Sequence, residues 1–144
     1  MTKSAEDLLH NCLFFTANSL ARSISRLAEE EFGRLGLVPS HAFLLMLVID
    51  RPGISQKDLA AQLHLAPSTV SRFVDVLAGR GLLEKRGLGK QVQAWPTAAG
   101  QAQLAPIQLA WGEIHRRYSA ILGEEEGRSL ARLTDEAQRR LDGE

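Results

Sequence analysis

The middle of the chain holds two short amphipathic segments followed by two alternating ones, and this order constrains the fold more than any other feature. Ser55, with Asp58 three residues later, has the spacing of a capping box at a helix N-terminus. Pro67 marks the first turn of a second helix, whose apolar residues are spaced to form one buried face. Segments 82–86 and 91–95 alternate as strands do, with glycines between them. The predicted order is helix, tight turn, helix and hairpin.

Long helices are predicted on both sides of this unit, so the chain is expected to be mainly α-helical with one small β-hairpin. Residues 5–32 place apolar side chains at spacings of three and four, which predicts one continuous amphipathic helix. A helix opening at Pro39 is apolar on nearly all sides over 42–49, so its centre is predicted to be buried. Thr97 is expected to cap a further long helix kinked at Pro106, and an acidic run begins a last one.

Length and composition favour a single intracellular domain. A chain of 144 residues can bury one core without disulfides or metals. The only cysteine is Cys12, which excludes an internal disulfide framework and a multi-cysteine zinc site. The acidic N-terminus and an apolar run limited to 42–49 indicate no targeting or membrane-spanning segment, so we expect a cytoplasmic protein.

Charge is unevenly distributed along the chain, although the formal net charge is zero. Residues 1–50 have 4 Lys and Arg against 6 Asp and Glu, residues 51–100 have 7 against 3, and residues 101–144 have 6 against 8. A local positive field is what a phosphate backbone requires, whatever the average over the chain. An imbalance of this size also arises by chance in proteins that bind no nucleic acid.

The start of the second short helix has the residue types that entry into a DNA major groove requires. That groove is roughly 12 Å wide, so the outer face of an entering helix must be small and polar. Such residues are also ordinary at helix starts, where they cap or solvate the first turn. The combination of two helices, a glycine stop and a basic hairpin is more specific than any single part. The outer-face residues are Ser68, Thr69, Ser71 and Arg72.

Five stretches, taken in order, resemble the MarR family of bacterial regulators. They are LGLVPS at 35–40, ISQKDLA at 54–60, LAPSTVSRFVDVL at 65–77, GLLEKR at 81–86 and PTAAG at 96–100. The resemblance implies a winged helix-turn-helix that binds DNA as a homodimer, a repressor on a pseudo-palindromic operator released by a small effector. It divides the single domain, 1–144, into a DNA-binding core at 38–96 and dimerisation helices at 1–34 and 97–144.

The resemblance also assigns a DNA-contacting set. These residues are Ser55, Gln56, Pro67, Ser68, Thr69, Ser71, Arg72, Lys85, Arg86 and Lys90. The wing departs from the family pattern because the tip, 87–91, contains neither Asp nor Arg, so no tip arginine is available for the minor groove. Val38 and Ala66 stand where the family tends to place a capping hydroxyl, which weakens those helix starts by about 1 kcal/mol each.

An effector site between the DNA-binding and dimerisation parts is the second site that the resemblance implies, for a small aromatic or anionic molecule. The candidate lining residues are Phe14, Phe15, His41, Trp111 and His115. Aromatic residues at helical spacing also fit an ordinary core. Cys12 is expected to be a packed, inert thiol beside apolar neighbours, with oxidant sensing as the alternative. The histidines are scattered, so we expect no metal site and no cofactor.

Two classes of function remain for this sequence. No nucleophilic triad order, phosphate-binding glycine loop or carboxylate pair indicates an enzyme. A DNA-binding regulator is favoured, and a helical interaction module that has lost DNA binding is the alternative. The atypical wing and the neutral net charge are what support the alternative.

Overall fold

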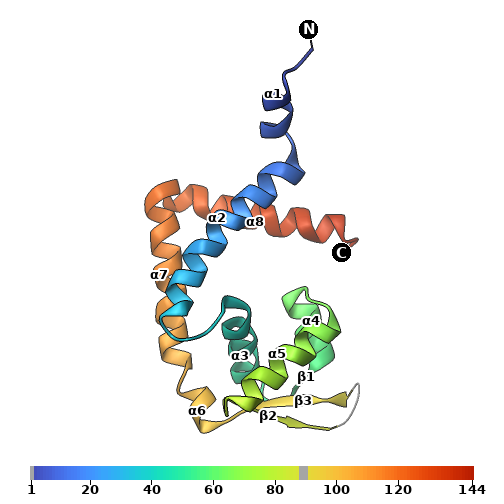
Figure 1. The fold of residues 1–144 in the computed structure, drawn as a ribbon, viewed down its shortest axis with the longest axis vertical. Helices are drawn as coiled ribbons and strands as arrows, with labels where there is room; N and C mark the ends of the chain where they lie inside the picture. The colour runs from blue at the N-terminus through green and yellow to red at the C-terminus, as the bar shows by residue number, and fades with distance from the viewer. Residues whose placement is uncertain (1, 88–90) are drawn as a thin grey trace.

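The structure is a computed structural model that describes residues 2–87 and 91–144, and it is mostly helical with one small sheet (Figure 1). The elements are α1 (Ala5–His10), α2 (Leu13–Gly33), α3 (Pro39–Asp50), β1 (Ile54–Ser55), α4 (Gln56–Leu63), α5 (Pro67–Gly79), β2 (Leu83–Arg86), β3 (Gln93–Pro96), α6 (Ala98–Gln101), α7 (Leu104–Leu122) and α8 (Glu124–Leu141). The predicted fold class, mainly α with a small β-wing, is confirmed. Within 2–87 and 91–144, no helix has both the length and the apolar character needed to cross a bilayer.

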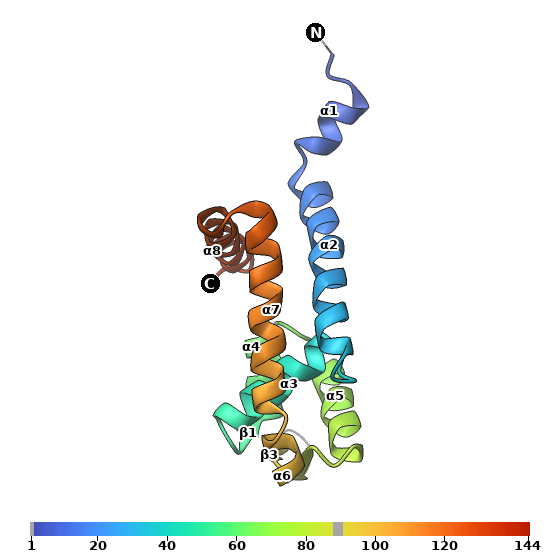
Figure 2. The ribbon, with the colours of Figure 1, turned by 90° about the vertical axis from the view of Figure 1, so that its left-hand side faces the viewer.

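The hydrophobic core is built around α3, as its apolar sequence predicts. Ala42, Leu44, Leu45 and Val48 are fully buried on this one helix. In Figure 1, α3, α4, α5 and the sheet form the lower part of the molecule, and α2, α7 and α8 form the upper part. Helices α2 and α7 pack side by side, which Figure 2 also shows. The upper and lower parts therefore meet at α3 and at the lower ends of α2 and α7.

The sheet contains one strand that the sequence did not predict. Strand β3 lies in the middle, pairing antiparallel with β2 on one side and with β1 on the other. Ile54 stands opposite Ala94 in the β1–β3 pair. Strand β1 has two residues, too few for the alternation that identifies a strand in a sequence.

The predicted continuous helix over 5–32 is wrong, because the chain breaks between α1 and α2. Asn11 ends α1, and its side-chain amide donates a hydrogen bond of 2.8 Å to the carbonyl of Asp7. Cys12 is extended, and its carbonyl accepts a hydrogen bond from the Thr16 hydroxyl. Short polar side chains compete with the helix for backbone groups in this way. In Figures 1 and 2, α1 projects away from the rest of the chain.

The long helix expected after Thr97 is also divided, and the kink predicted at Pro106 is wrong. Thr97 caps α6, since its hydroxyl oxygen accepts a hydrogen bond from the amide of Gly100. The chain then turns at Ala102 and Gln103 before α7 begins. Pro106 thereby lies in the first turn of α7, where a missing amide hydrogen breaks no helical hydrogen bond. Proline is accommodated by a new helix start instead of a kink.

Helix α6 packs closely on the residues that lead into β2. The Thr97 hydroxyl donates to the carbonyl of Gly81, and the Thr97 amide donates to the carbonyl of Leu82. Gly100 is buried, and a Cβ atom there would overlap the Leu82 carbonyl oxygen. No side chain can be added at this position unless the backbone moves.

We therefore expect Gly100→Ala to lower the free energy of unfolding by about 1–3 kcal/mol, the usual result of overpacking. Gly112→Ala is the matched control, because Gly112 lies within α7 and a Cβ there meets nothing within 4 Å. The control should raise stability by about 0.5–1 kcal/mol, since alanine favours a helix interior. Chemical denaturation of both variants measures the difference. Equal stabilities for the two would contradict the close approach.

Candidate nucleic-acid interface

Helices α4 and α5 form the helix-turn-helix, and local capping sets where each begins. The Ser55 hydroxyl oxygen accepts a hydrogen bond of 3.0 Å from the Asp58 amide, which confirms the predicted cap of α4. The chain leaves α4 through His64 in the left-handed conformation, at φ 55°. Ala66 precedes α5 without a side-chain cap, as its sequence predicts. The turn from 64 to 66 is short enough to hold the two helices at a fixed angle.

Helix α5 separates a buried face from an exposed one. Val70, Val74 and Leu77 are fully buried against the core. The predicted recognition residues lie at the start and on the outer side of the same helix. Pro67, Ser68 and Arg72 are exposed, and Thr69 and Ser71 are half-buried. These five side chains come together at one end of one helix, as a reading surface requires.

The two cations of strand β2 have different surroundings. Lys85 donates a hydrogen bond to the Asp75 carboxylate on α5, so it links the wing to the recognition helix. Arg86 lies over the ring of Trp95, with its guanidinium carbon 4.5 Å from the ring centroid. Lys90, the third predicted wing cation, lies outside the described residues. Sequence reasoning identified these cations but found neither the Asp75 partner nor the Trp95 partner, which lie 10 and 9 positions away along the chain.

Ser55 and Gln56 have structural tasks at the start of α4. The Ser55 side chain caps α4, and the backbone amide of Gln56 donates a hydrogen bond to the carbonyl of Val92. Both side chains are half-buried. They lie at the β1 edge of the sheet, beside β3 and at the start of α4.

A cavity of about 450 Å³ lies where α2, α3 and α7 meet. Of the five side chains predicted for an effector site, the structure brings Trp111 and His115 to this cavity, with their rings stacked at 5.2 Å. Phe43 packs edge-on against Trp111, also at 5.2 Å. The lining residues are Ile24, Ser25, Ala28, Glu29, Val38, Pro39, Ser40, Phe43, Trp111, Ile114 and His115.

The other three predicted effector residues lie elsewhere. Phe14 is 80% exposed near the start of α2, and Phe15 packs against His10. His41 packs against Phe73 of α5 at 4.5 Å, and burial together with the charge of Arg80 lowers its pKa. The nine lining residues that the sequence analysis missed belong to separate segments, and no local pattern joins those segments.

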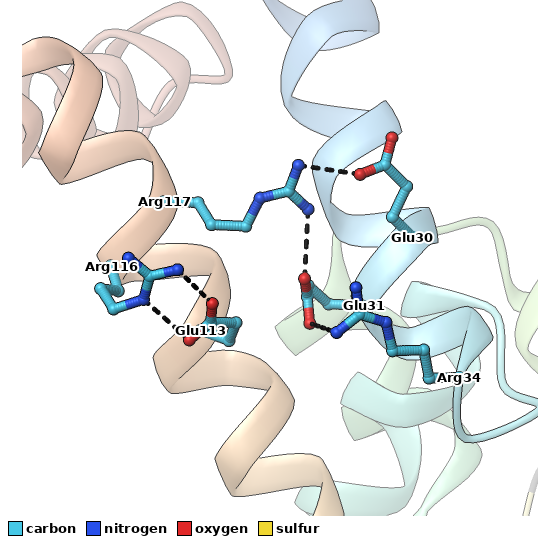
Figure 3. Close-up of polar contacts among 6 residues, drawn as sticks. All are labelled: Glu30, Glu31, Arg34, Glu113, Arg116 and Arg117. Atoms are coloured by element: carbon cyan, nitrogen blue, oxygen red, sulfur yellow. Dashed lines mark hydrogen bonds and ion pairs between the residues drawn. The ribbon is translucent and has the colours of Figure 1, made fainter.

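An ion-pair cluster holds α2 against α7 beside the cavity (Figure 3). The Arg117 guanidinium contacts Glu30 at 2.8 Å and Glu31 at 3.1 Å, and Glu31 also contacts Arg34 at 3.3 Å. Glu31 is only 5% exposed, so these two arginines compensate a buried carboxylate. The hydrogen bond to Glu30 raises the pKa of Arg117. The cluster fixes the spacing of two of the three helices that line the cavity.

No group of three or more His, Cys, Asp or Glu side chains that could hold a metal ion occurs in the described part of the chain. Cys12 is a free, half-buried thiol at the break between α1 and α2. The described residues include a polar helix end, flanking cations and an aromatic-walled cavity, which are features that recognition requires.

Comparisons with known proteins agree with this geometry. Residues 37–87, from the segment before α3 to the end of β2, match the model of the MarR family. No curated protein matches the sequence. The chain is similar in structure to a probable transcriptional regulator from Pseudomonas aeruginosa, with 23% identity and a TM-score of 0.80 over 90% of this chain and 98% of that one.

Two structures described as the transcriptional repressor CouR are also similar. The one bound to p-coumaroyl-CoA has 21% identity and a TM-score of 0.84, over 96% of this chain and 99% of that one. The one bound to a 23-mer DNA duplex has 20% identity and a TM-score of 0.83, over 96% and 100%. The fold and the exposed helix end define the class as winged helix-turn-helix. Within that class the resemblance predicted from the sequence is confirmed over residues 37–87, which match the MarR family model, and the chain shares its fold with these solved structures.

Proposed function

We propose that this protein is a transcriptional repressor that binds a pseudo-palindromic operator as a homodimer. The observation that carries the proposal is helix α5, whose inner face is fully buried while its first two turns present polar side chains to solvent. A helix held in this way can enter a major groove without loss of core packing. The similar CouR structure with a DNA duplex supports this use of the fold.

Within the interface we assign base contacts to α5 and phosphate contacts to its surroundings. Arg72 is exposed one turn beyond Ser68, where a guanidinium can form two hydrogen bonds with a guanine edge. Asp75, which could otherwise pair with Arg72 and divert it from DNA, forms an ion pair with Lys85. Among the described residues Arg72 takes part in no ion pair, which leaves its donors for DNA. We also assign to DNA contact the remaining predicted residues that the structure describes, Ser55, Gln56, Pro67, Thr69, Ser71, Lys85 and Arg86. Lys90, predicted with them, lies outside the described residues.

We assign dimerisation to the segments 1–34 and 97–144, which leaves 38–96 as the DNA-binding core. Helix α1 packs mainly on α2 and has no buried residue. A helix of six residues is not stable in isolation, so it requires a surface to pack on. Large apolar side chains are exposed along both segments, as expected of a face that a second copy covers. They include Leu8, Leu9, Leu13, Phe14, Ile121, Leu122, Leu133 and Leu141.

We further propose that a small aromatic effector binds in the cavity between α2, α3 and α7 and releases the DNA. The cavity touches both the dimerisation helices and α3, the helix on which α5 packs. Its volume accommodates an aromatic ring with a short substituent, and Phe43 and Trp111 supply aromatic walls. The similar CouR structure contains p-coumaroyl-CoA, whose acyl group is aromatic, and this supports an aromatic effector.

The DNA-binding proposal is tested with duplexes selected from a random library by the wild-type protein. Arg72→Ala should cost about 1–3 kcal/mol on the selected duplex and relax the preference at one base-pair position. Arg140→Ala removes the same charge from an exposed position in the last turn of another helix, α8, and should leave that preference unchanged. Equal losses of Arg72→Ala on selected and scrambled duplexes would mean that Arg72 only positions the helix. Failure of the wild type to enrich any sequence would reject DNA recognition and favour an interaction module.

The homodimer is tested by light scattering at micromolar concentration. We expect twice the mass of one 15.8 kDa chain. Leu133→Glu together with Leu141→Glu should dissociate the dimer, because both side chains are exposed on one face of α8. Arg132→Glu is the control with a similar change on the polar face of α8. A stable wild-type monomer would contradict the assignment of the terminal segments.

The effector proposal is tested by DNA release, first with p-coumaroyl-CoA and its free acid and then with other aromatic acids. Ala28→Phe should abolish release while leaving DNA affinity intact, since Ala28 lines the cavity and a larger side chain occupies its volume. Ala120→Phe, an equal enlargement at an exposed position, serves as the control. Release that persists in Ala28→Phe would place the effector elsewhere.

A further inference from the structure

The wing hairpin has two chemically different faces. Because side chains alternate along strands, Leu83 and Lys85 share one face with their partners Pro96 and Ala94. Leu83 and Ala94 are buried, and β2 packs on α5, so this is the inner face. Lys85 on this side reaches the Asp75 carboxylate of α5. The outer face carries Glu84, Arg86, Gln93 and Trp95.

The ring of Trp95 packs against the turn that contains Gly53. Gly53 has φ +88°, and its amide donates a 2.8 Å hydrogen bond to the carbonyl of Ala94. A Cβ atom at Gly53 would lie 2.9 Å from Cζ2 of Trp95, so only glycine leaves room for the ring. The indole nitrogen of Trp95 is buried and has no hydrogen-bond partner in the described residues. The side chain is therefore held by the packing of its ring. The cost of burying an N–H without an acceptor offsets part of the stabilisation from that packing.

Arg86 is held against this ring from the neighbouring strand. Glu84 stands directly opposite Trp95, which makes Arg86 the diagonal neighbour of Trp95, within reach of a long side chain. The guanidinium carbon lies 4.5 Å from the ring centroid, and Nη2 contacts Glu84 at 3.4 Å. The Arg86 side chain remains 58% exposed. A stacked guanidinium keeps its donors in the plane, where they can still bind a phosphate.

We propose that Trp95 is a positioning residue that orients Arg86 toward a DNA phosphate, so that the phosphate contact of the wing includes the end of β2. This inference depends on the proposed DNA binding. Three observations carry it: the ring is seated by Gly53, the guanidinium lies over the ring, and Lys85 is engaged by α5. Arg86 is thus the cation of β2 that is both exposed and held in one orientation by an aromatic ring. Glu84 opposes the contact, because it shares the guanidinium and repels phosphate.

The experiment measures affinity for the selected and scrambled duplexes at several salt concentrations. Arg86→Ala should weaken both duplexes about tenfold and reduce the salt slope by about one unit per contacting protomer. Trp95→Leu, which keeps the charge of Arg86, should weaken both duplexes by a smaller factor. Trp95→Phe should restore most of that loss, because a phenyl ring still supports a guanidinium. Glu84→Gln should strengthen binding to both duplexes.

The double variant Arg86→Ala with Trp95→Leu identifies an effect that passes through Arg86. If Trp95 acts only by positioning, the double variant is no weaker than Arg86→Ala alone. Additive losses, or wild-type affinity for Arg86→Ala, would overturn the inference. Arg140→Ala is the charge control and should match the wild type. Thermal unfolding of each variant separates a loss of fold from a loss of orientation, and Arg86→Ala tests the contact even where Trp95→Leu unfolds. If the wild type itself binds no DNA, the proposed function fails, which is a distinct result.

Discussion

Burial of helix α3 is the constraint on which the rest of the structure depends. This helix packs against α2, α4, α5, α6, α7 and β3, so nearly every other element is placed relative to it. Four of its side chains are fully buried. Helix α5 packs on it, and it lines the cavity between α2, α3 and α7. A shift of α3 therefore cannot be confined to one part. It would move the recognition helix and change the cavity at the same time, because well-packed side chains transmit displacement.

The link between the two parts of the molecule is made by a few specific contacts. The Arg80 guanidinium, at the end of α5, donates a 2.9 Å hydrogen bond to the Gly36 carbonyl in the connection between α2 and α3. The Arg117 cluster ties α2 to α7 a few residues away from the cavity. His41 joins α3 to Phe73 of α5. A small rearrangement at this junction would therefore displace residues that contact the end and the middle of α5.

Much of the helix-turn-helix could be predicted from the sequence, because its signals are local. Ser55 and Pro67 mark helix starts that capping and proline chemistry dictate, and the structure has both helices there. The breaks at Asn11 and at Ala102 were missed because the helical spacing of apolar residues continues across both positions, whereas the helical backbone ends at each. The partners of Lys85 and Arg86 and most of the cavity lining were missed because they depend on contacts between separate elements. Exposure of Ser68 and Arg72 followed from periodicity alone.

The two-residue strand β1 has a consequence for how copies of the chain can associate. It covers the edge of β3 that would otherwise have free backbone groups, and it is too short to extend the sheet further. The opposite edge belongs to β2, whose Glu84, Lys85 and Arg86 place charge along the strand. Short and charged edges are poor templates for strand addition. The sheet is thereby protected from aggregation through its edges, and the exposed apolar side chains of the helices are the surface that the proposed dimer would use.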